Sequence, residues 1–368
     1  MPLIINRRGG ARLPNRRIPV VPPFPRPDPQ EQSKAPEAEK EEAEASVSGA
    51  SESEEFGPNP KDVYDVRLIL EEAGNFPPEV ADMIIDYAEY WACTTTIADY
   101  RSLQGGHLTI RGGRPGEDRF LLRTEPIALA HWKPASQELW RRESKPRVVD
   151  PAAEESDFEY PQATLEALAE EPLPDLERPV RKVVFDITSR DQGWSSEPRS
   201  DIAYRNSHTW FDAGLERFDR TITCPEDCPD RQDPDYASCN IPTCALRPLW
   251  PPSVAGVAGP EAPTAAPAPA QYDHVLHPTP DHCIQLNKLA DRTSCHHRVE
   301  WRADDDIVPD TPDAEEKLAA IGRGPSTGDG EFVRNLKLGD VITVWGRARY
   351  PGWANHVERV EVRVFWAV

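Results

Sequence analysis

The chain has 368 residues, with 63 Asp and Glu against 42 Lys and Arg, which gives a formal net charge of −21. This excess of negative charge opposes binding to phosphate backbones and to anionic lipid surfaces, so we expect neither a nucleic-acid nor a membrane partner. Forty prolines and a hydrophobic content of 38% predict that part of the chain stays outside any compact core.

Features that direct a protein to a compartment are scarce. No stretch reaches the about 18–20 consecutive apolar residues of a transmembrane helix, and residues 1–25 lack the apolar segment of a secretory signal. These residues are rich in arginine, as in a mitochondrial transit peptide, but their prolines argue against an amphipathic helix. Seven cysteines, an odd number, favour a reducing compartment, and we expect a cytoplasmic or nuclear location.

Residues 1–60 predict a disordered tail, in which a basic, proline-rich piece precedes an acidic one. Residues 19–29 could form a polyproline II ligand for SH3 or WW domains, and a solvated tail is the simpler interpretation. Residues 61–100 predict a helical hairpin, because apolar residues recur at helical spacing on both sides of Gly74. On the second helix this apolar stripe includes Val80, Met83, Ile84 and Tyr87.

The segment from Phe76 to Tyr90 resembles the start of an F-box: a hydrophobic residue, two prolines, an acidic residue and then an apolar helix. The resemblance implies that the chain is a substrate adaptor of a ubiquitin ligase. It also implies a docking surface for the adaptor subunit, made of Phe76, Pro77, Glu79 and Ile84. The alternative is a hairpin that packs on the rest of the protein.

Residues 101–368 predict an antiparallel, jelly-roll-like β-sandwich, so the fold class is mainly β. The clearest strand is the last one, in which Val360, Val362, Val364, Trp366 and Val368 alternate with more polar residues. Further strands are expected near residues 107, 119, 182, 209, 284, 297 and 342. The first two of these flank a Gly-Gly-Arg-Pro-Gly turn, which predicts a β-hairpin. We expect flexible insertions at 141–178 and 220–282.

Four motifs in this order resemble a family of uncharacterised fungal proteins. They are Phe76 to Trp91, Asp191 to Ser195, Ser207 to Phe211 and the segment from Gly339 to Val368. The resemblance implies a helical N-terminal segment followed by a β-sandwich-like region in a fungal host. It implies no particular reaction.

Four cysteines suggest a metal site inside the second insertion. Cys224, Cys228, Cys239 and Cys244 form two closely spaced pairs, which could place four thiolates around a structural zinc ion. Free thiols or a single disulfide are the alternatives. His296 and His297 are neighbours on a predicted strand and should face opposite ways, so we do not expect them to share a metal.

Two clusters could bind a ligand. Asp191, Gln192, Trp194 and Trp210 combine polar groups with rings, as in carbohydrate-binding β-sandwiches, and a structural turn is the alternative. Arg347, Arg349 and Trp353 could form a cationic and aromatic patch for an anionic or peptide ligand. Alternatively, these side chains cover one face of a sheet and pair with acids.

The sequence contains no nucleophile elbow, Walker loop, dinucleotide-binding fingerprint or H-E-x-x-H zinc motif. We therefore expect a non-enzymatic intracellular protein that binds a protein partner. A carbohydrate-type binding module, a ubiquitin-ligase adaptor and, least favoured, a hydrolase are the alternatives. No cofactor is expected beyond the candidate structural zinc, and the sequence carries no signal of an oligomeric state.

Overall fold

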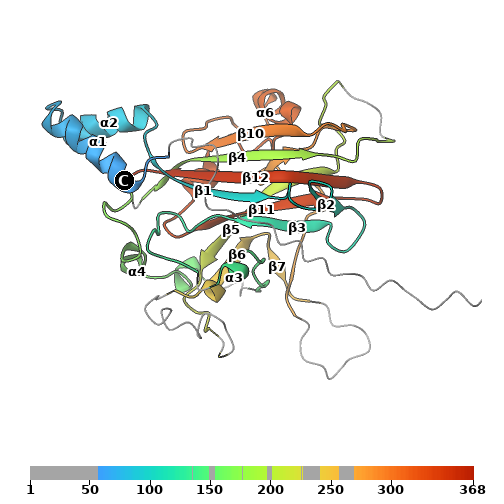
Figure 1. Ribbon diagram of the computed structural model, residues 1–368, viewed down its shortest axis with the longest axis horizontal. Coiled ribbons are helices and arrows are strands. Elements are labelled where there is room, and N and C mark those ends of the chain that lie inside the picture. The colour runs from blue at the N-terminus through green and yellow to red at the C-terminus, as the bar shows by residue number, and fades with distance from the viewer. Residues whose placement is uncertain are drawn as a thin grey trace, which may run out of the picture. The chain divides into compact units, whose positions relative to one another are not determined.

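The computed structural model describes residues 57–134, 136–148, 154–175, 177–196, 201–224, 226, 241–256 and 269–368. Most of the predicted tail, including residues 19–29, lies outside these described residues. Within them the protein is mainly β, with two packed antiparallel sheets that follow a pair of helices (Figure 1). The prediction of a β-sandwich preceded by a helical segment is confirmed at this level.

Helices are short, apart from the first two. Their bounds are α1 (Pro60–Glu72), α2 (Pro78–Tyr87), α3 (Gln137–Trp140), η1 (Glu155–Asp157), α4 (Gln162–Glu166), η3 (Thr243–Ala245), α6 (Pro312–Lys317), η4 (Ala319–Ile321) and α7 (Glu331–Arg334). Helix α1 begins with a capping box, in which Asn59 and Asp62 each accept a hydrogen bond from the other's backbone N–H.

Twelve strands are present among the described residues. They are β1 (Ala92–Asp99), β2 (Leu108–Arg111), β3 (Asp118–Arg123), β4 (Val180–Arg190), β5 (Thr209–Phe218), β6 (Leu246–Trp250), β7 (Ser253–Val254), β8 (Gln271–Tyr272), β9 (Cys283–Leu286), β10 (Cys295–Arg302), β11 (Val341–Ala348) and β12 (Ala354–Trp366). Each of the eight predicted strand positions falls in or next to one of these strands.

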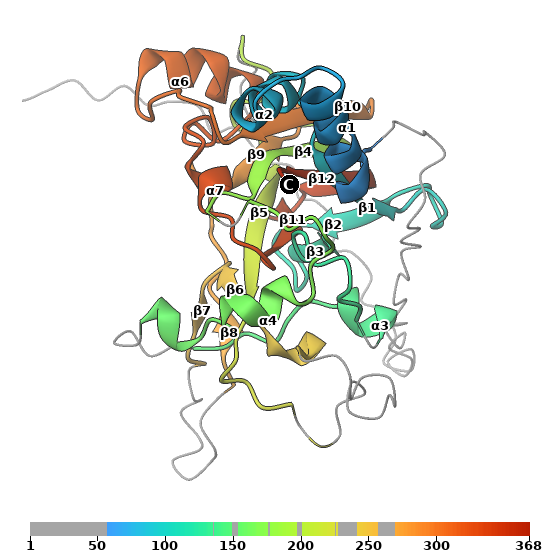
Figure 2. The same ribbon diagram turned by 90° about the vertical axis from the view of Figure 1, so that its left-hand side faces the viewer.

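The strands form two five-stranded sheets. Sheet A has the order β1-β12-β4-β10, with β2 also beside β12, and sheet B has the order β3-β11-β5-β6, with β9 also beside β5. Strands β7 and β8 form a small separate ribbon. In both views α1, α2 and α6 lie on the side of β10 and β4, whereas α3, α4, β6 and β7 lie on the opposite side (Figure 1, Figure 2).

The inner faces of the two sheets share one hydrophobic core. On β12, Val360, Val362, Val364 and Trp366 are buried in it, as the alternation in the sequence predicts. On β4, Phe185 lies edge-on to Trp301 of β10, with ring centroids 5.0 Å apart. Full burial of side chains of this size contributes about 1.5–3 kcal/mol each. The last strand is therefore a central element of the fold.

The predicted β-hairpin between residues 107 and 124 is wrong, because its two strands lie in different sheets. Strand β2 pairs with β12, and β3 pairs with β11. The intervening turn packs on the turn between β11 and β12: Gly112 N donates to Trp353 O, and a Cβ at Gly112 would lie 2.5 Å from Tyr350 O. Both turns carry the chain from one sheet to the other at the same end of the sandwich.

Some segments form strands or helices that the sequence did not predict. Residues 92–99, within the segment predicted as a helical hairpin, form β1, which pairs along its whole length with β12. The described parts of the predicted insertions carry η1, α4 and β6 to β8, and β6 extends sheet B beside β5. The other residues of these insertions lie outside the described part of the chain.

The helical hairpin is anchored to sheet A. Val63 and Ile85 join the hydrophobic core, and Glu89 pairs with Lys182 of β4 and with Arg302 of β10. These two cations lower the pKa of Glu89 to about 2. The hairpin is therefore attached by both apolar and ionic contacts.

His297 gives the fold a pH dependence that can be measured. Its ring faces inward from β10, its Nε2 makes no hydrogen bond within the protein, and burial lowers its pKa to about 4. Between the ordinary pKa and this value the unfolded chain binds more protons than the folded chain. Stability is therefore lost as the pH falls through this window.

The free energy of unfolding of the wild type should fall between about pH 7 and pH 5. We expect this fall to be about 1–2 kcal/mol smaller in His297→Leu, because leucine cannot bind a proton. Urea denaturation at several pH values measures this difference. His277→Leu is the matched control, because the side chain of His277 is exposed. Equal pH profiles for the wild type and the His297 variant would contradict the assignment.

Candidate functional site

Asp191 holds two loops together. It is fully buried, and its carboxylate accepts hydrogen bonds from Gly193 N at 2.6 Å and Ala290 N at 2.5 Å. Burial raises its pKa. Gln192 also fixes the turn, because it donates to Trp194 O and accepts from Ala354 N. The predicted ligand contact of Asp191 is therefore wrong, and the alternative of a structural turn describes this residue.

The turn presents Trp194 at the surface. Its side chain is 55% exposed, and its ring edge lies against Gly352, where an added Cβ would be 3.3 Å away. Nearby, the half-buried His208 makes edge-on ring contacts with Tyr350 and Trp353, with centroids 4.8 Å and 4.7 Å apart. We call these four residues, Trp194, His208, Tyr350 and Trp353, the aromatic end surface. Trp194 thus lies against the turn that carries Tyr350 and Trp353.

Trp210 lies elsewhere, in the interior. It is fully buried on β5, its indole Nε1 donates to Asp212 at 2.9 Å, and the guanidinium of Arg349 lies 5.2 Å from its ring centre. The expected exposed ring is therefore wrong. The polar neighbours that suggested exposure are themselves buried as hydrogen-bond and ion-pair partners.

Arg347 and Arg349 are also buried, so the expected surface patch is wrong. Arg347 pairs with Asp212 at 3.0 Å and with Asp118, and Arg349 pairs with Asp118 at 2.6 Å. Burial raises the pKa of Asp212 to about 6, even though Arg347 opposes this shift. Residues 271–275 cover these charges: Tyr272 and His274 contact the ring of Trp345, and Val275 O accepts from Arg349.

The same face carries a second buried pair, Arg123 with Glu216, joined at 2.6 Å and 3.1 Å. At the end of β5, Arg217 binds both carboxylate oxygens of Asp340. The deeply buried carboxylates of Asp212, Glu216 and Asp340 are thus each held by an arginine. Their geometry is that of structural ion pairs.

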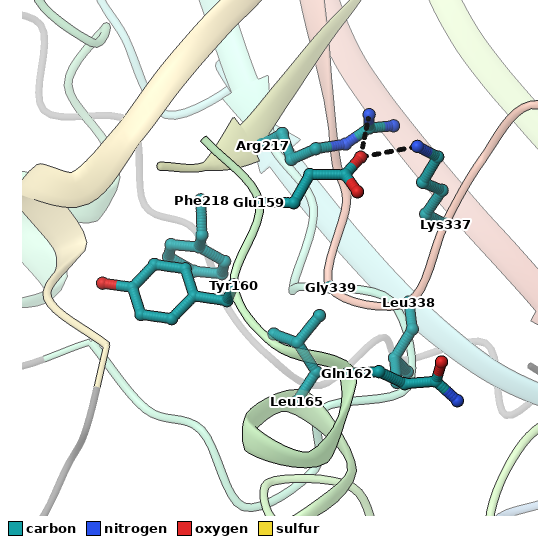
Figure 3. Close-up of a pocket in the computed structure, with 9 residues that line it drawn as sticks. All are labelled: Glu159, Tyr160, Gln162, Leu165, Arg217, Phe218, Lys337, Leu338 and Gly339. Carbon is teal, nitrogen blue, oxygen red and sulfur yellow. Dashed lines mark hydrogen bonds and ion pairs between the residues drawn. The ribbon is translucent and has the colours of Figure 1, made fainter. Parts of the chain in front are cut away.

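A small pocket of about 150 Å³ is lined by Arg217, the partner of Asp340 (Figure 3). Glu159 bridges Arg217 and Lys337, at 3.2 Å and 2.5 Å. Leu165, Leu338 and Phe218 supply apolar walls, and the hydroxyl of Tyr160 points away from the charged groups (Figure 3). Two cations and two carboxylates balance here, so the pocket offers no excess charge to a ligand.

The predicted metal site can be described only in part. Cys224 and Cys244 are half-buried, whereas Cys228 and Cys239 lie outside the described residues. Within the described ranges, no three His, Cys, Asp or Glu side chains form a group that could hold a metal ion. The zinc prediction therefore stays a prediction. His297 is buried and His296 exposed, so the expected opposite orientation is confirmed.

The hairpin exposes the residues that the F-box resemblance singled out. Phe76, Pro77 and Glu79 are exposed, and Ile84 is half-buried. The stripe expected to pack is displaced, because Ala81 and Ile85 are the buried residues of α2. Met83 and Tyr87 are instead 70% and 94% exposed. Since these two residues are four apart, they lie next to each other on the outer face of the helix.

Comparisons of the chain with family models, with curated proteins and with solved structures each found no match. They support neither the fungal nor the F-box resemblance. No helix in the described part of the chain has the length and apolar character needed to cross a bilayer.

The Asp212–Arg347 pair gives a sharp test of the buried charges. We expect Arg347→Met to lower the free energy of unfolding by about 3–5 kcal/mol, because it leaves a buried carboxylate without its cation. In the double variant Asp212→Asn/Arg347→Met that carboxylate is gone, and the new amide oxygen can still accept from Trp210. The double variant should therefore regain at least half of the loss.

Chemical denaturation at neutral pH measures both effects. Arg142→Gln is the control, since Arg142 is 57% exposed in its pair with Glu138 and such pairs contribute about 0–1 kcal/mol. A double variant no more stable than the single variant would show that the pairing is not the cause.

Proposed function

We propose that this chain is a non-enzymatic protein-interaction protein that binds a partner polypeptide through the α1–α2 hairpin. The observation that carries the proposal is the exposure of Met83 and Tyr87, joined by Ile69 at 61% and Phe76 at 42%. Large apolar side chains gathered on one exposed element are typical of a binding surface.

The hairpin has the rigidity that a binding surface needs. Arg67 joins the two helices through Asp82, while Glu89 is held by Lys182 and Arg302. The exposed apolar side chains therefore project from an anchored pair of helices, so little conformational entropy is lost on binding.

Charge indicates the chemistry of the partner. Between residues 60 and 90 the sequence has eight acidic residues, at 62, 65, 71, 72, 79, 82, 86 and 89, against two basic residues, at 61 and 67. A partner segment with apolar side chains flanked by Lys or Arg would complement this surface. We therefore propose a basic amphipathic helix as the occupant.

An F-box-like role would make the partner the adaptor subunit of a ubiquitin ligase. The exposure of Phe76, Pro77 and Glu79 is compatible with that role. However, α2 ends at Tyr87 and β1 begins at Ala92, which leaves no room for the further helices of an F-box. We therefore base the proposal on the surface itself and not on the resemblance.

The docking surface can be tested by cross-linking and then by binding. A photo-reactive residue in place of Tyr87 should form a cross-link to a partner. The same photo-reactive residue in place of Val308, which is 63% exposed, should not cross-link that partner. The purified partner should bind the wild type and Val308→Asp equally. It should bind Met83→Asp at least tenfold more weakly, because central apolar contacts carry about 2 kcal/mol or more.

Calorimetric titration measures these affinities, and the affinity should fall with added salt because the hairpin is acidic. The cross-linked segment of the partner should be apolar with basic flanks. A partner that binds Met83→Asp as tightly as the wild type, or that cross-links equally at both positions, would contradict the proposal.

A second candidate function is carbohydrate binding at the aromatic end surface. The observation that favours it is the exposed ring of Trp194, which lies against Gly352 in the turn that carries Tyr350, 40% exposed, and the half-buried Trp353. Exposed rings stack on the apolar faces of sugars. Neither Asp191 nor Trp210 takes part in this version of the site.

On a glycan array, we expect the wild type to retain a ligand that Trp194→Ala binds at least tenfold more weakly, since the stacking ring is lost. Val308→Ala is the control for an exposed apolar residue. Intrinsic tryptophan fluorescence should change on titration with the retained glycan. If no glycan is retained, or if Trp194→Ala retains the same one, this candidate fails.

A further inference from the structure

One end of the outer face of sheet A carries four basic side chains and a hydroxyl side by side. In the registers of β2 and β4 with β12, Thr109 and Arg190 both lie opposite His356. Arg111 follows Thr109 by two residues, so it lies on the same face. The ring of His107 meets that of His356 edge-on, with centroids 4.6 Å apart. We call these five residues, His107, Thr109, Arg111, Arg190 and His356, the basic cluster.

The basic cluster is open to solvent. It lies where β2 runs along the first residues of β12, at the end of that strand away from the C-terminus (Figure 1). Arg111 is exposed, and the other four residues are half-buried. Thr109 Oγ1 and His356 Nδ1 are joined by a hydrogen bond of 3.1 Å, which fixes the imidazole in the middle of the cluster. Arg190 Nη1 donates to the backbone oxygen of Asp191 at 3.4 Å, so most of its donors are left for a ligand.

The basic cluster contains no acid. Within the described part of the chain, no Asp or Glu side chain forms an ion pair with Arg111 or Arg190. Further along the same face, Arg363 and Arg298 both pair with Asp186, at 2.8 Å and 3.5 Å. Acids outnumber bases by 63 to 42 in the chain, so the lack of acid at this place is a local feature. Neighbouring like charges repel, and a bound anion would remove this repulsion.

The surroundings of His356 reflect the same imbalance. Burial and, after it, the charges of Arg190, His107 and Arg111 lower the pKa of His356 to about 4. A negative charge placed among these side chains would favour the imidazolium, because an opposite charge stabilises the charged form of a titratable group. The imidazole would then add a charged donor to those of the two arginines.

The layout fits a tetrahedral anion better than a planar one. Arg111 and Arg190 lie on strands that flank β12 on its two sides, so their guanidinium groups approach a shared ligand from different directions. A phosphate group presents three acceptor oxygens and about 1.5–2 negative charges at neutral pH, enough for both arginines and His356. A carboxylate has two oxygens in one plane, and a single guanidinium can use both.

We propose that the basic cluster binds a phosphate group, with Arg111 and Arg190 on its outer oxygens and His356 beneath it. Inorganic phosphate and small phosphate monoesters share this chemistry, and titration distinguishes them. The net charge of −21 repels a polyanion, which favours a small phosphorylated molecule over a nucleic acid. The site shares no residue with the hairpin or with the aromatic end surface, so it does not depend on the functions proposed for them.

Three anions test the proposal on the full chain: phenyl phosphate, inorganic phosphate and benzoate. Each is titrated by calorimetry at low ionic strength up to about 10 mM, a range that reaches millimolar dissociation constants. We expect phosphate binding in this range, with benzoate roughly tenfold weaker or more, because it cannot serve both arginines. Equal affinity for the two phosphates identifies the phosphate group alone as the ligand, and tighter binding of phenyl phosphate identifies a monoester.

Variants test whether the arginines are responsible. Arg190→Gln and Arg111→Gln should each weaken phosphate binding roughly tenfold, since each removes a charged donor. Arg298→Gln is the matched control, because Arg298 lies on the same face, is 43% exposed and already pairs with two carboxylates. Without ligand, Arg190→Gln should keep or raise the Tm, because it removes a repulsive charge. If Arg190→Gln does not fold, the exposed Arg111 still provides the test.

Four outcomes would overturn the proposal. One is that neither phosphate binds. Another is that benzoate binds as tightly as phenyl phosphate, which would remove the preference for a tetrahedral anion. The third is binding that survives in the double variant Arg111→Gln/Arg190→Gln, which would place the anion elsewhere on the chain. The fourth is equal weakening by Arg298→Gln, which would reduce the effect to one of net charge.

Discussion

The outer face of sheet B depends on buried arginine–carboxylate pairs. Asp212 and Glu216 on β5 reach Arg347 on β11 and Arg123 on β3, so the pairs tie three strands together. In a sandwich this face would usually be solvated, but here residues 271–275 cover it. The cover is tolerable only because each charge has its partner, since an unpaired buried charge costs several kcal/mol. The covering segment and the ion pairs therefore require each other.

This pairing decides where function can reside. Tryptophan, arginine and aspartate often bind ligands, but here Trp210 and Arg347 are buried in the interior. Asp191 instead joins two loops through its hydrogen bonds. What is left at the surface includes large apolar side chains, those of Met83, Tyr87 and Trp194. The proposed hairpin surface and the aromatic end surface are built on these side chains.

The sequence predicted what is local and missed what is not. Alternation along 360–366 and 183–187 identifies strands, because each strand buries its own apolar face. The turn at 112–117 does not reveal that its flanking strands diverge, since the choice is made by packing against residues 349–353. Helix α2 is apolar over more than one face, so spacing could not tell Ile85 from Met83. Trp194 and Trp210 both have polar neighbours, and only the long-range pair of Asp212 with Arg347 decides which ring is buried.

The two exposed surfaces are related through the strands of sheet A. In the register of β12 with β4, Trp366 lies opposite Val180 and His356 lies opposite Arg190. The hairpin leads into β1, whose first residue, Ala92, lies beside Trp366, whereas Trp194 follows the far end of β4. At about 3.4 Å per residue, the length of β4 separates the two ends by roughly 34 Å. A partner on the hairpin and a ligand at the aromatic end surface can therefore bind at the same time. Continuous paired strands connect the two surfaces, so the sandwich holds them at a fixed separation.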